Sequence, residues 1–348
     1  MNQDWQNFLT QHGAQLSEGI VQHFGNLQEE LLATRDGTVL FDLSQFGTIK
    51  VSGEEAQKFL QNLLSNDISA VSLTTAQLSS FNSPKGRMLA TFIIWQQEGN
   101  YYLQLPRSLT PAMHKKLAMY VLRAKVKVSD VSDEIVCLGI SGNGAAEQVK
   151  QHCGLSLEQD WSAGQQDGPS VIRLSAQRYQ INTTTQQAIA LWDKLSKSAK
   201  AAGSSCWDWL NIRAGIPVVT PATQEQFVLQ MANLDILGGV SFKKGCYPGQ
   251  EIVARTHYLG KQKRRMFLAH VESDNATAAG DELFSEDMPG QPCGMVINAS
   301  AAPGGGVDLL AVMQISCRET QKVHLLSAQG ATLNFLPLPY PLPSGPDV

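Results

Sequence analysis

Apolar and polar residues alternate along this chain with two periods, one typical of helices and one typical of strands. Near the N-terminus, apolar residues recur every three or four positions, which predicts two short helices in the first thirty-odd residues. Between residues 39 and 128 the pattern predicts strand, helix, a hairpin of two strands, helix and strand. This order is that of a ferredoxin-like α+β unit.

The first helix of that unit carries a start signal. Ser52 and Glu55 have the spacing of a capping box, in which each side chain bonds the other residue's backbone N–H. Apolar residues follow on one helical face, and the helix is expected to end near residues 65–67. Residues 83–86 predict a turn and residues 111–124 predict the second helix.

The remaining chain predicts a second α+β unit and a β-rich end. A weaker repeat over residues 135–202 predicts strand, helix, two strands and a helix over 186–202, and a short helix is expected over 207–214. From about residue 261 short strands follow at regular spacing, which predicts a small barrel or jelly roll. We therefore expect an N-terminal helical extension, two α+β units and a β-barrel with a proline-rich tail. These parts are residues 1–36, 37–133, 134–260 and 261–348.

Composition excludes several classes of protein. Of 348 residues, 43% are hydrophobic and 17% are charged, so the chain can fill a core and is too apolar to be disordered. The net charge of -4 gives no global preference for nucleic acid or an anionic membrane. Apolar stretches fall far short of the roughly 18–20 residues that span a bilayer, and no leader pattern opens the sequence. We expect a soluble, cytoplasmic protein with no membrane partner.

The six cysteines predict free thiols. The closest two, Cys137 and Cys153, are sixteen residues apart, so no metal-ligand spacing occurs and no metal site is expected. Most should be buried as small apolar residues.

Cys246 lies in the segment with the clearest chemical signal. Gly245 and Gly249 flank it, so the backbone can turn tightly or approach a ligand there. Lys243 and Lys244 precede it, and a helix is predicted just after it, and both features favour the thiolate. Cys246 is a candidate reactive thiol, although a cysteine packed in a structural turn fits the same pattern. No histidine has a fixed relation to it, so nucleophilic catalysis is not indicated.

Positive charge gathers around the same segment. Between residues 243 and 265 the only acid is Glu251, and the basic residues are Lys243, Lys244, Arg255, Lys261, Lys263, Arg264 and Arg265. This basic run is either a solvated loop and strand start or a site for a phosphate, an acidic cofactor tail or RNA. Nearby, Trp207 and Trp209 could wall a flat heteroaromatic ligand, although core packing is the commoner role. No nucleotide-binding glycine motif is present.

The run Lys244-Gly245-Cys246-Tyr247-Pro248-Gly249-Gln250-Glu251, with Arg255 four residues on, closely resembles the signature of the YgfZ family. These are folate-binding proteins linked to tRNA modification and iron–sulfur proteins. Weaker matches lie at 83–87, 207–217 and 226–239, and the resemblance spans about residues 38–340. It implies the fold of the glycine-cleavage T-protein, with two ferredoxin-like α+β units and a C-terminal β-barrel around a central cavity.

The resemblance also implies binding residues for tetrahydrofolate or a derivative. Trp207 stands where the family has a folate-contacting tryptophan, and Phe46 replaces a second one. Arg213 stands where many relatives have an acid. The other implied residues are Asn211, Gln230, Asn233, Lys244, Tyr247, Gln250, Glu251 and Arg255.

The catalytic aspartate of the T-protein has no counterpart, because residues 85–90 contain no carboxylate. Folate binding is therefore expected to be kept and aminomethyl transfer lost, and whether any reaction is catalysed stays open. The leading hypothesis is a folate-binding factor for iron–sulfur cluster assembly or repair, with iron–sulfur enzymes, including those that modify tRNA, as clients. An alternative is a folate-dependent one-carbon transferase or demethylase that uses Asp67, Glu251 or Cys246 to handle protons. A third hypothesis is direct tRNA binding by the basic run.

Overall fold

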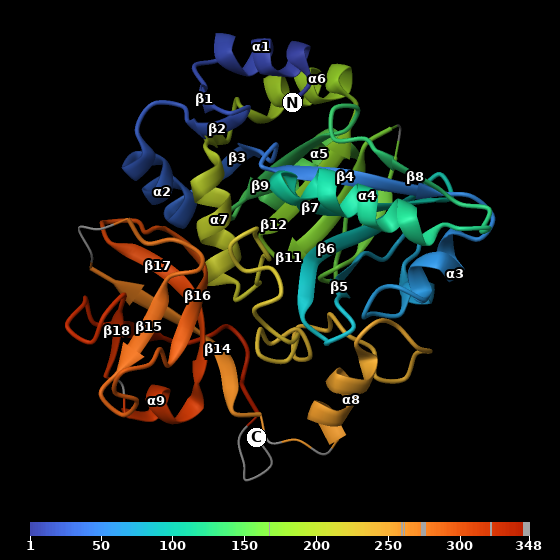
Figure 1. The fold of residues 1–348 in the computed structure, drawn as a ribbon. Helices are drawn as coiled ribbons and strands as arrows, with labels where there is room; N and C mark the ends of the chain where they lie inside the picture. The colour runs from blue at the N-terminus through green and yellow to red at the C-terminus, as the bar shows by residue number, and fades with distance from the viewer. Residues whose placement is uncertain (167, 259, 261, 273–275, 321, 344–348) are drawn as a thin grey trace. The chain divides into compact units, whose positions relative to one another are not determined.

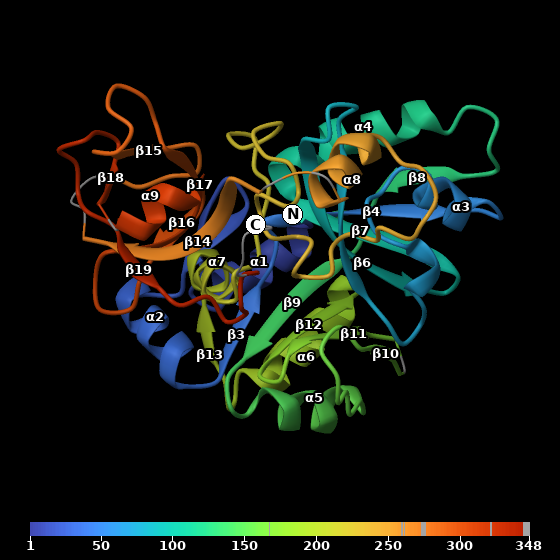
Figure 2. The ribbon, with the colours of Figure 1, turned by 90° about the horizontal axis from the view of Figure 1, so that it is seen from below.

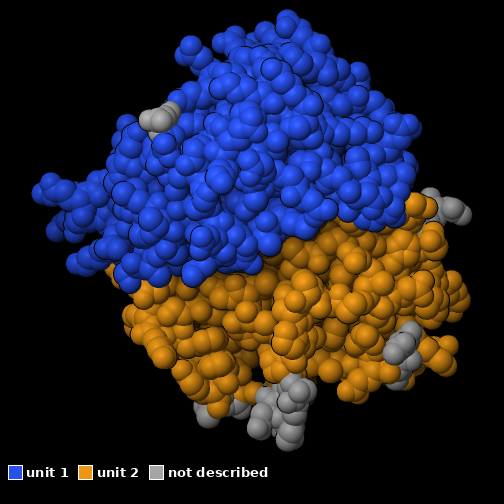
Figure 3. All heavy atoms as spheres, turned by 180° about the vertical axis from the view of Figure 1, so that it is seen from behind, with its two compact units in different colours: residues 1–59, 68–77, 93–207 blue, residues 60–67, 78–92, 208–348 orange. Residues whose placement is uncertain are grey.

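The computed structural model describes residues 1–166, 168–258, 260, 262–272, 276–320 and 322–343 (Figure 1). The chain forms two compact units. Unit 1 comprises residues 1–59, 68–77 and 93–207, and unit 2 comprises residues 60–67, 78–92 and 208–348 (Figure 3). The division falls within α3 (Ala56–Gln61), β5 (Gln77–Asn82), β6 (Met88–Gln97) and α7 (Ser204–Arg213). The four-part division expected from the sequence stays a prediction.

Unit 1 contains the first predicted ferredoxin-like arrangement. The latter part of β6 pairs with β7 (Asn100–Pro106), which pairs with β4 (Phe46–Ser52), and β4 pairs in turn with β8 (Lys127–Asp130). All these pairings are antiparallel, and α4 (Thr110–Tyr120) connects β7 to β8 after the 3-10 turn Arg107–Leu109. The predicted order of elements is therefore confirmed.

The second sheet of unit 1 has the order β10-β11-β12-β9-β3-β13. Its strands are β3 (Val39–Asp42), β9 (Val136–Ser141), β10 (Ala163–Gln165), β11 (Ser170–Ser175), β12 (Arg178–Thr183) and β13 (Lys200–Ala202). The helices α5 (Ala145–Cys153) and α6 (Thr185–Leu195) pack against it through apolar side chains (Figure 2). This is the second α+β arrangement, with β3 inserted between its first and last strands. The helix predicted over 186–202 ends earlier, at Leu195, and residues 200–202 form β13.

The N-terminal segment also belongs to unit 1. The helices α1 (Gln3–Gln11) and α2 (Leu27–Asp36) are the two that the spacing predicts, and a hairpin of β1 (Gln15–Ser17) and β2 (Ile20–His23) separates them. α1 packs beside α6, where the rings of Trp5 and Trp192 meet edge to face (Figure 1).

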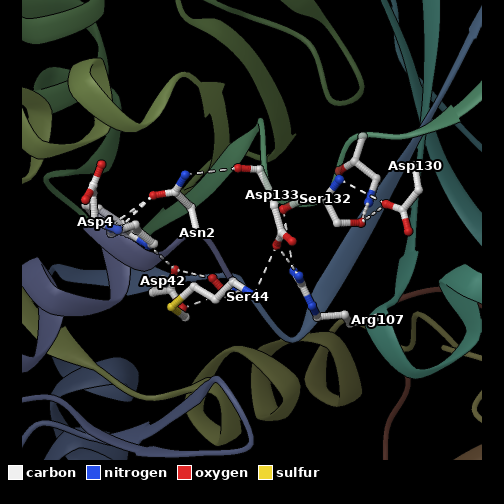
Figure 4. A network of polar contacts seen from close by, with 11 residues as sticks. Asn2, Asp4, Asp42, Ser44, Arg107, Asp130, Ser132 and Asp133 are labelled. Atoms are coloured by element: carbon white, nitrogen blue, oxygen red, sulfur yellow. Dashed lines mark hydrogen bonds and ion pairs between the residues drawn. The ribbon is translucent and has the colours of Figure 1, made fainter.

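Polar contacts fasten the start of α1 to the rest of unit 1. The Asn2 side chain accepts hydrogen bonds from the N–H groups of Asp4 and Trp5, and it donates to the Asp133 carbonyl (Figure 4). Asp133 also forms an ion pair with Arg107. The Trp5 indole donates to the buried Asp42 carboxylate at 2.7 Å. The N-terminal helix is thus an integral part of unit 1.

Unit 2 contains a six-stranded antiparallel sheet with the order β18-β15-β16-β17-β14-β19. Its strands are β14 (Arg264–Val271), β15 (Glu282–Ser285), β16 (Gly294–Ala301), β17 (Val307–Gln314), β18 (Val323–Leu325) and β19 (Asn334–Leu336). A short helix that the sequence did not indicate, α9 (Ile315–Thr320), follows β17. The helix α8 (Gln250–Tyr258) and the long segment 214–249 precede the sheet.

The predicted capping box is wrong. The Glu55 carboxylate accepts the backbone N–H of Lys125 at 2.8 Å, so it does not bond back to Ser52. Gly53 has a φ of +115°, and a Cβ there would lie 2.1 Å from the Lys125 carbonyl oxygen. The chain therefore turns sharply before α3 begins at Ala56, because the 125 region packs against this turn. The η1 turn at Ile68–Ala70 follows the segment after α3.

Candidate functional site

The glycine that precedes α8 is required by a close backbone contact within unit 2. Gly249 has a φ of +79°, and a Cβ there would lie 2.5 Å from both the Gly86 Cα and the Ser83 carbonyl oxygen. Gly86 donates its N–H to that Ser83 oxygen at 2.9 Å, which confirms the predicted turn at 83–86. Gly245 differs, because nothing lies within 4 Å of an added Cβ. Of the two flanking glycines, only Gly249 has the close approach that the sequence suggests.

Lys244 holds the signature segment to the chain that follows α3. Its ammonium group donates to the carbonyl oxygens of Gln61 at 2.6 Å, Leu64 at 2.5 Å and Asn66 at 3.0 Å. Burial lowers the pKa of Lys244 to about 8, and the nearby Asp67 carboxylate opposes this shift. All three ammonium hydrogens therefore have acceptors within unit 2, so none of them is left to bond the thiol of Cys246.

Cys246 is exposed, whereas the other five cysteines are buried, and all six are free. This distribution confirms the contrast predicted from the sequence. The next residue, Tyr247, is buried, and burial raises the pKa of its phenol. Glu251 and Arg255 are exposed one helical turn apart on α8, and Gln250 is half-buried at its start. An exposed thiol thus precedes a helix that has an acidic and a basic side chain exposed to solvent.

The described residues of the basic run do not form a continuous exposed patch, because two of its cations bind partners within the protein. Lys244 is bound to carbonyls, and Arg265 is buried and forms an ion pair with Asp235 at 2.8 Å. Lys261 lies outside the described residues. The remaining cations are Lys243, Arg255 and Lys263, which are exposed, and Arg264, which is half-buried.

Gln230 and Asn233 are buried and fasten neighbouring elements of unit 2. The Gln230 amide donates to the Val253 carbonyl in α8 at 2.7 Å, and the Asn233 amide donates to the Met266 carbonyl in β14 at 2.8 Å. Asn233 has a φ of +58°, a left-handed conformation that asparagine tolerates better than most residues. Within the described part of the chain the Gln230 Oε1 atom has no hydrogen-bond partner. It is therefore an available buried acceptor.

Asn211 and Trp209 lie in the part of α7 that belongs to unit 2, and both are buried. The Trp209 indole donates to Asp308 at 2.9 Å, and His270 bonds the other oxygen of that carboxylate at 2.8 Å. Arg213 is exposed, with a nitrogen 3.5 Å from Asp308. Trp209 thus has a structural partner in the sheet of unit 2, which agrees with core packing.

Trp207 is 2% exposed and belongs to unit 1, as does the half-buried Phe46 at the first position of β4. The Trp207 ring lies over Gly139 in β9, where an added Cβ would approach it to 2.5 Å. The Arg178 guanidinium carbon lies 4.1 Å from the centroid of the Trp207 ring. The glycine therefore leaves room for the ring of this tryptophan against the sheet.

A row of buried polar side chains on β12 lies on the same face of the sheet as the Trp207 ring. Arg178, Gln180 and Asn182 alternate along the strand, so their side chains point the same way. Gln180 is opposite Gly139 in the ladder, which places the row on the face that Trp207 covers. The Gln180 amide donates to Asn182 at 2.7 Å.

Three buried amide atoms near this face have no hydrogen-bond partner among the described residues. They are Gln180 Oε1, Asn182 Nδ2 and Gln104 Nε2. Thr48 is opposite Gln104 in the first sheet, and its hydroxyl lies 3.9 Å from the thiol of Cys137, which is opposite Asn182 in the second sheet, so the strands of both sheets contribute. Because such buried atoms are normally paired, this cluster is a candidate ligand site. The sequence did not reveal it, since alternating polar residues in a strand usually face water.

Within the described chain, no three His, Cys, Asp or Glu side chains gather to hold a metal ion. No described helix is both long enough and apolar enough to cross a bilayer.

Two ferredoxin-like sheets followed by an antiparallel β-sheet define the class of this protein, and comparisons place it in a family. The chain belongs to the family of the GCVT N-terminal domain, whose model matches residues 7–243. The crystal structure of the glycine cleavage system aminomethyltransferase T from Bartonella henselae is similar over 96% of both chains, with a TM-score of 0.78 and 19% identity. This similarity confirms the predicted T-protein-like fold.

A second solved structure is a weaker match. The heterotetrameric sarcosine oxidase from Corynebacterium sp. U-96, in complex with pyrrole 2-carboxylate, matches 49% of this chain and 92% of its own, at 14% identity and a TM-score of 0.35. A TM-score this low supports no conclusion about the chain.

Proposed function

We propose that this protein is a tetrahydrofolate-binding member of the YgfZ group within its family. It would act in the cytoplasm as an accessory factor for assembly or repair of iron–sulfur clusters, including those of enzymes that modify tRNA. The cluster of unpartnered amides beside Trp207 carries the folate part of this proposal. The match of residues 244–251 and Arg255 to the YgfZ signature supports the accessory role.

The unpartnered atoms fit a pterin. A pterin ring is flat and has both hydrogen-bond donors and acceptors along one edge. Gln180 Oε1 offers an acceptor, and the amides of Asn182 and Gln104 offer donors. Leaving each atom unpaired costs about 1–3 kcal/mol, and a bound ligand that pairs them removes that cost. Trp207 adds an aromatic surface to the same face of the sheet.

When bound, tetrahydrofolate supplies a carrier for one-carbon units. The chain's own residues would bind and orient it, with the β12 amides holding the pterin edge and the indole covering the sheet beside it. The segment 85–90, which corresponds to the acid-bearing turn of the T-protein, has no carboxylate to move a proton. This supports a binding role over aminomethyl transfer.

One observation favours the alternative of a folate-dependent one-carbon transferase or demethylase. Lys244, with its pKa lowered to about 8 by burial, is suited to exchange protons near neutral pH. Asp67, a candidate proton carrier, attracts that ammonium group electrostatically and accepts a hydrogen bond from the Gln61 side chain at 3.0 Å. Formation of methylene-tetrahydrofolate from a methylamine donor would establish this alternative.

Anaerobic calorimetric titration with tetrahydrofolate tests the main proposal. The wild-type chain should bind one equivalent, and Trp207→Ala and Asn182→Leu should each weaken binding at least tenfold. Gln148→Leu is the matched control, because its amide oxygen is also unpartnered but lies on α5 in the same unit. The folate proposal fails if the wild-type chain does not bind, or if the control weakens binding as much as the two site variants.

A further inference from the structure

A cavity of about 420 Å3 lies entirely within unit 2, beside α9 and the C-terminal segment. Apolar side chains form most of its wall, namely Phe267, Ile315, Leu336, Leu338 and Leu342. A volume of this size is typical of sites for small organic ligands. None of the residues expected to bind folate lines it.

Arg318 brings a positive charge to this apolar wall. Its guanidinium carbon lies 4.3 Å from the centroid of the Phe335 ring and 5.9 Å from that of Phe267. The side chain is half-buried, and burial lowers the pKa of the guanidinium. In the described part of the chain it forms no ion pair or hydrogen bond, although Glu319 also lines the cavity and is exposed. The cation is therefore partly desolvated and has no counter-ion among the described residues.

A partly buried cation of this kind is stabilised by an anion that reaches it. The planar guanidinium matches a carboxylate, which it can bind through two parallel hydrogen bonds. Arg318 is the only cation among the described residues that line the cavity, and the exposed Glu319 carboxylate beside it disfavours a second negative charge on the ligand. The apolar wall favours a hydrocarbon tail on the same molecule.

We propose that this cavity binds a small amphipathic monocarboxylate, with the carboxylate at Arg318 and the hydrocarbon tail against the leucine side chains. The proposal is independent of folate binding, because none of the residues expected to bind folate lines this cavity. Medium-chain fatty acids have the required chemistry.

Titration of the full-length protein with sodium decanoate tests the proposal. Saturable binding of one molecule is expected, and octanoate should bind about fifteenfold more weakly, because each buried methylene contributes about fourfold in affinity. Arg318→Met should weaken decanoate binding at least tenfold, since it keeps an apolar stem beside the two rings and removes the charge. Lys322→Met is the matched control, because it removes an exposed cation paired with Glu286 elsewhere in unit 2.

Several results would overturn the proposal. These are no binding, equal binding of decanol and decanoate, or equal weakening by the control variant. Circular dichroism checks that Arg318→Met is folded, and Leu342→Trp, which fills the cavity without touching the charge, should weaken binding independently. If only a chain ending at Pro343 bound decanoate, the C-terminal residues would be the natural occupant and the proposal would be wrong.

Discussion

The ammonium group of Lys244 lies 2.5 Å from the carbonyl oxygen of Leu64, and it also binds the carbonyls of Gln61 and Asn66. A single side chain thus satisfies three backbone acceptors at the end of α3 and after it. The signature lysine is therefore part of the framework of unit 2, whatever else it contacts.

Replacing this lysine should destabilise the protein measurably. Lys244→Met leaves three partly buried carbonyls without their donor, and we expect the free energy of unfolding to fall by about 2–4 kcal/mol. Urea unfolding followed by tryptophan fluorescence measures the change. Lys243→Met is the control, because its side chain is exposed and its loss should change stability by less than about 0.5 kcal/mol. Equal effects of the two variants would contradict the role given to the three carbonyl contacts.

The two glycines of the signature should differ when each is replaced by alanine. At Gly249 the new Cβ would meet the Gly86 and Ser83 backbone at 2.5 Å in a left-handed conformation. We expect Gly249→Ala to cost about 2 kcal/mol or more and to lower the melting temperature by several degrees. Gly245→Ala meets open space and should leave the melting temperature unchanged.

These positions show what the sequence could and could not reveal. The order of strands and helices was predictable, because hydrophobic periodicity is local and the ferredoxin-like order follows from it. The insertion of β3 between β9 and β13 was not, because β3 pairs with residues 96 to 161 positions further along the chain. The partners of Glu55 and Lys244 were hidden for the same reason.

The candidate site was predictable only in part. The sequence indicates Cys246 through its flanking glycines and lysines, and its role in a site stays a prediction. The amides of β12 were missed, because a strand that reads polar-apolar-polar normally faces water on its polar side. Only the ladder shows that Gln180 stands opposite Gly139 and beneath Trp207.

The His270–Asp308 contact predicts a pH-dependent stability. Burial alone would lower the pKa of His270, but hydrogen bonds and charge from Asp308 and Glu272 outweigh burial and raise it. The folded state therefore holds the proton more tightly than the unfolded state. This contribution is fully present below the unfolded pKa of about 6.5 and is lost as pH rises through the folded value.

Unfolding free energies measured between pH 5 and pH 9 test this prediction. The difference in stability between the wild-type chain and His270→Gln should decrease as pH rises above about 6.5. Glu272→Gln, which removes the more exposed partner, should reduce that decrease but leave part of it, because Asp308 still contacts the ring at 2.8 Å. A difference that is constant across this range would show that His270 keeps the same charge in both states.

The exposed thiol gives the sharpest test of the accessory role. Because the Cys246 side chain faces solvent, Cys246→Ala should leave the melting temperature within about one degree of the wild-type value. In cells whose only copy of the protein carries this change, an iron–sulfur enzyme that methylthiolates tRNA should lose most of its activity, measured as modified nucleoside by mass spectrometry. Cys153→Ala, at a buried thiol on α5, is the control, and it should lower the melting temperature while tRNA modification stays normal. Normal tRNA modification in the Cys246→Ala cells would exclude a role for the thiol in that function. Folate binding is measured separately on the purified variant, so this result would leave the proposed folate site standing.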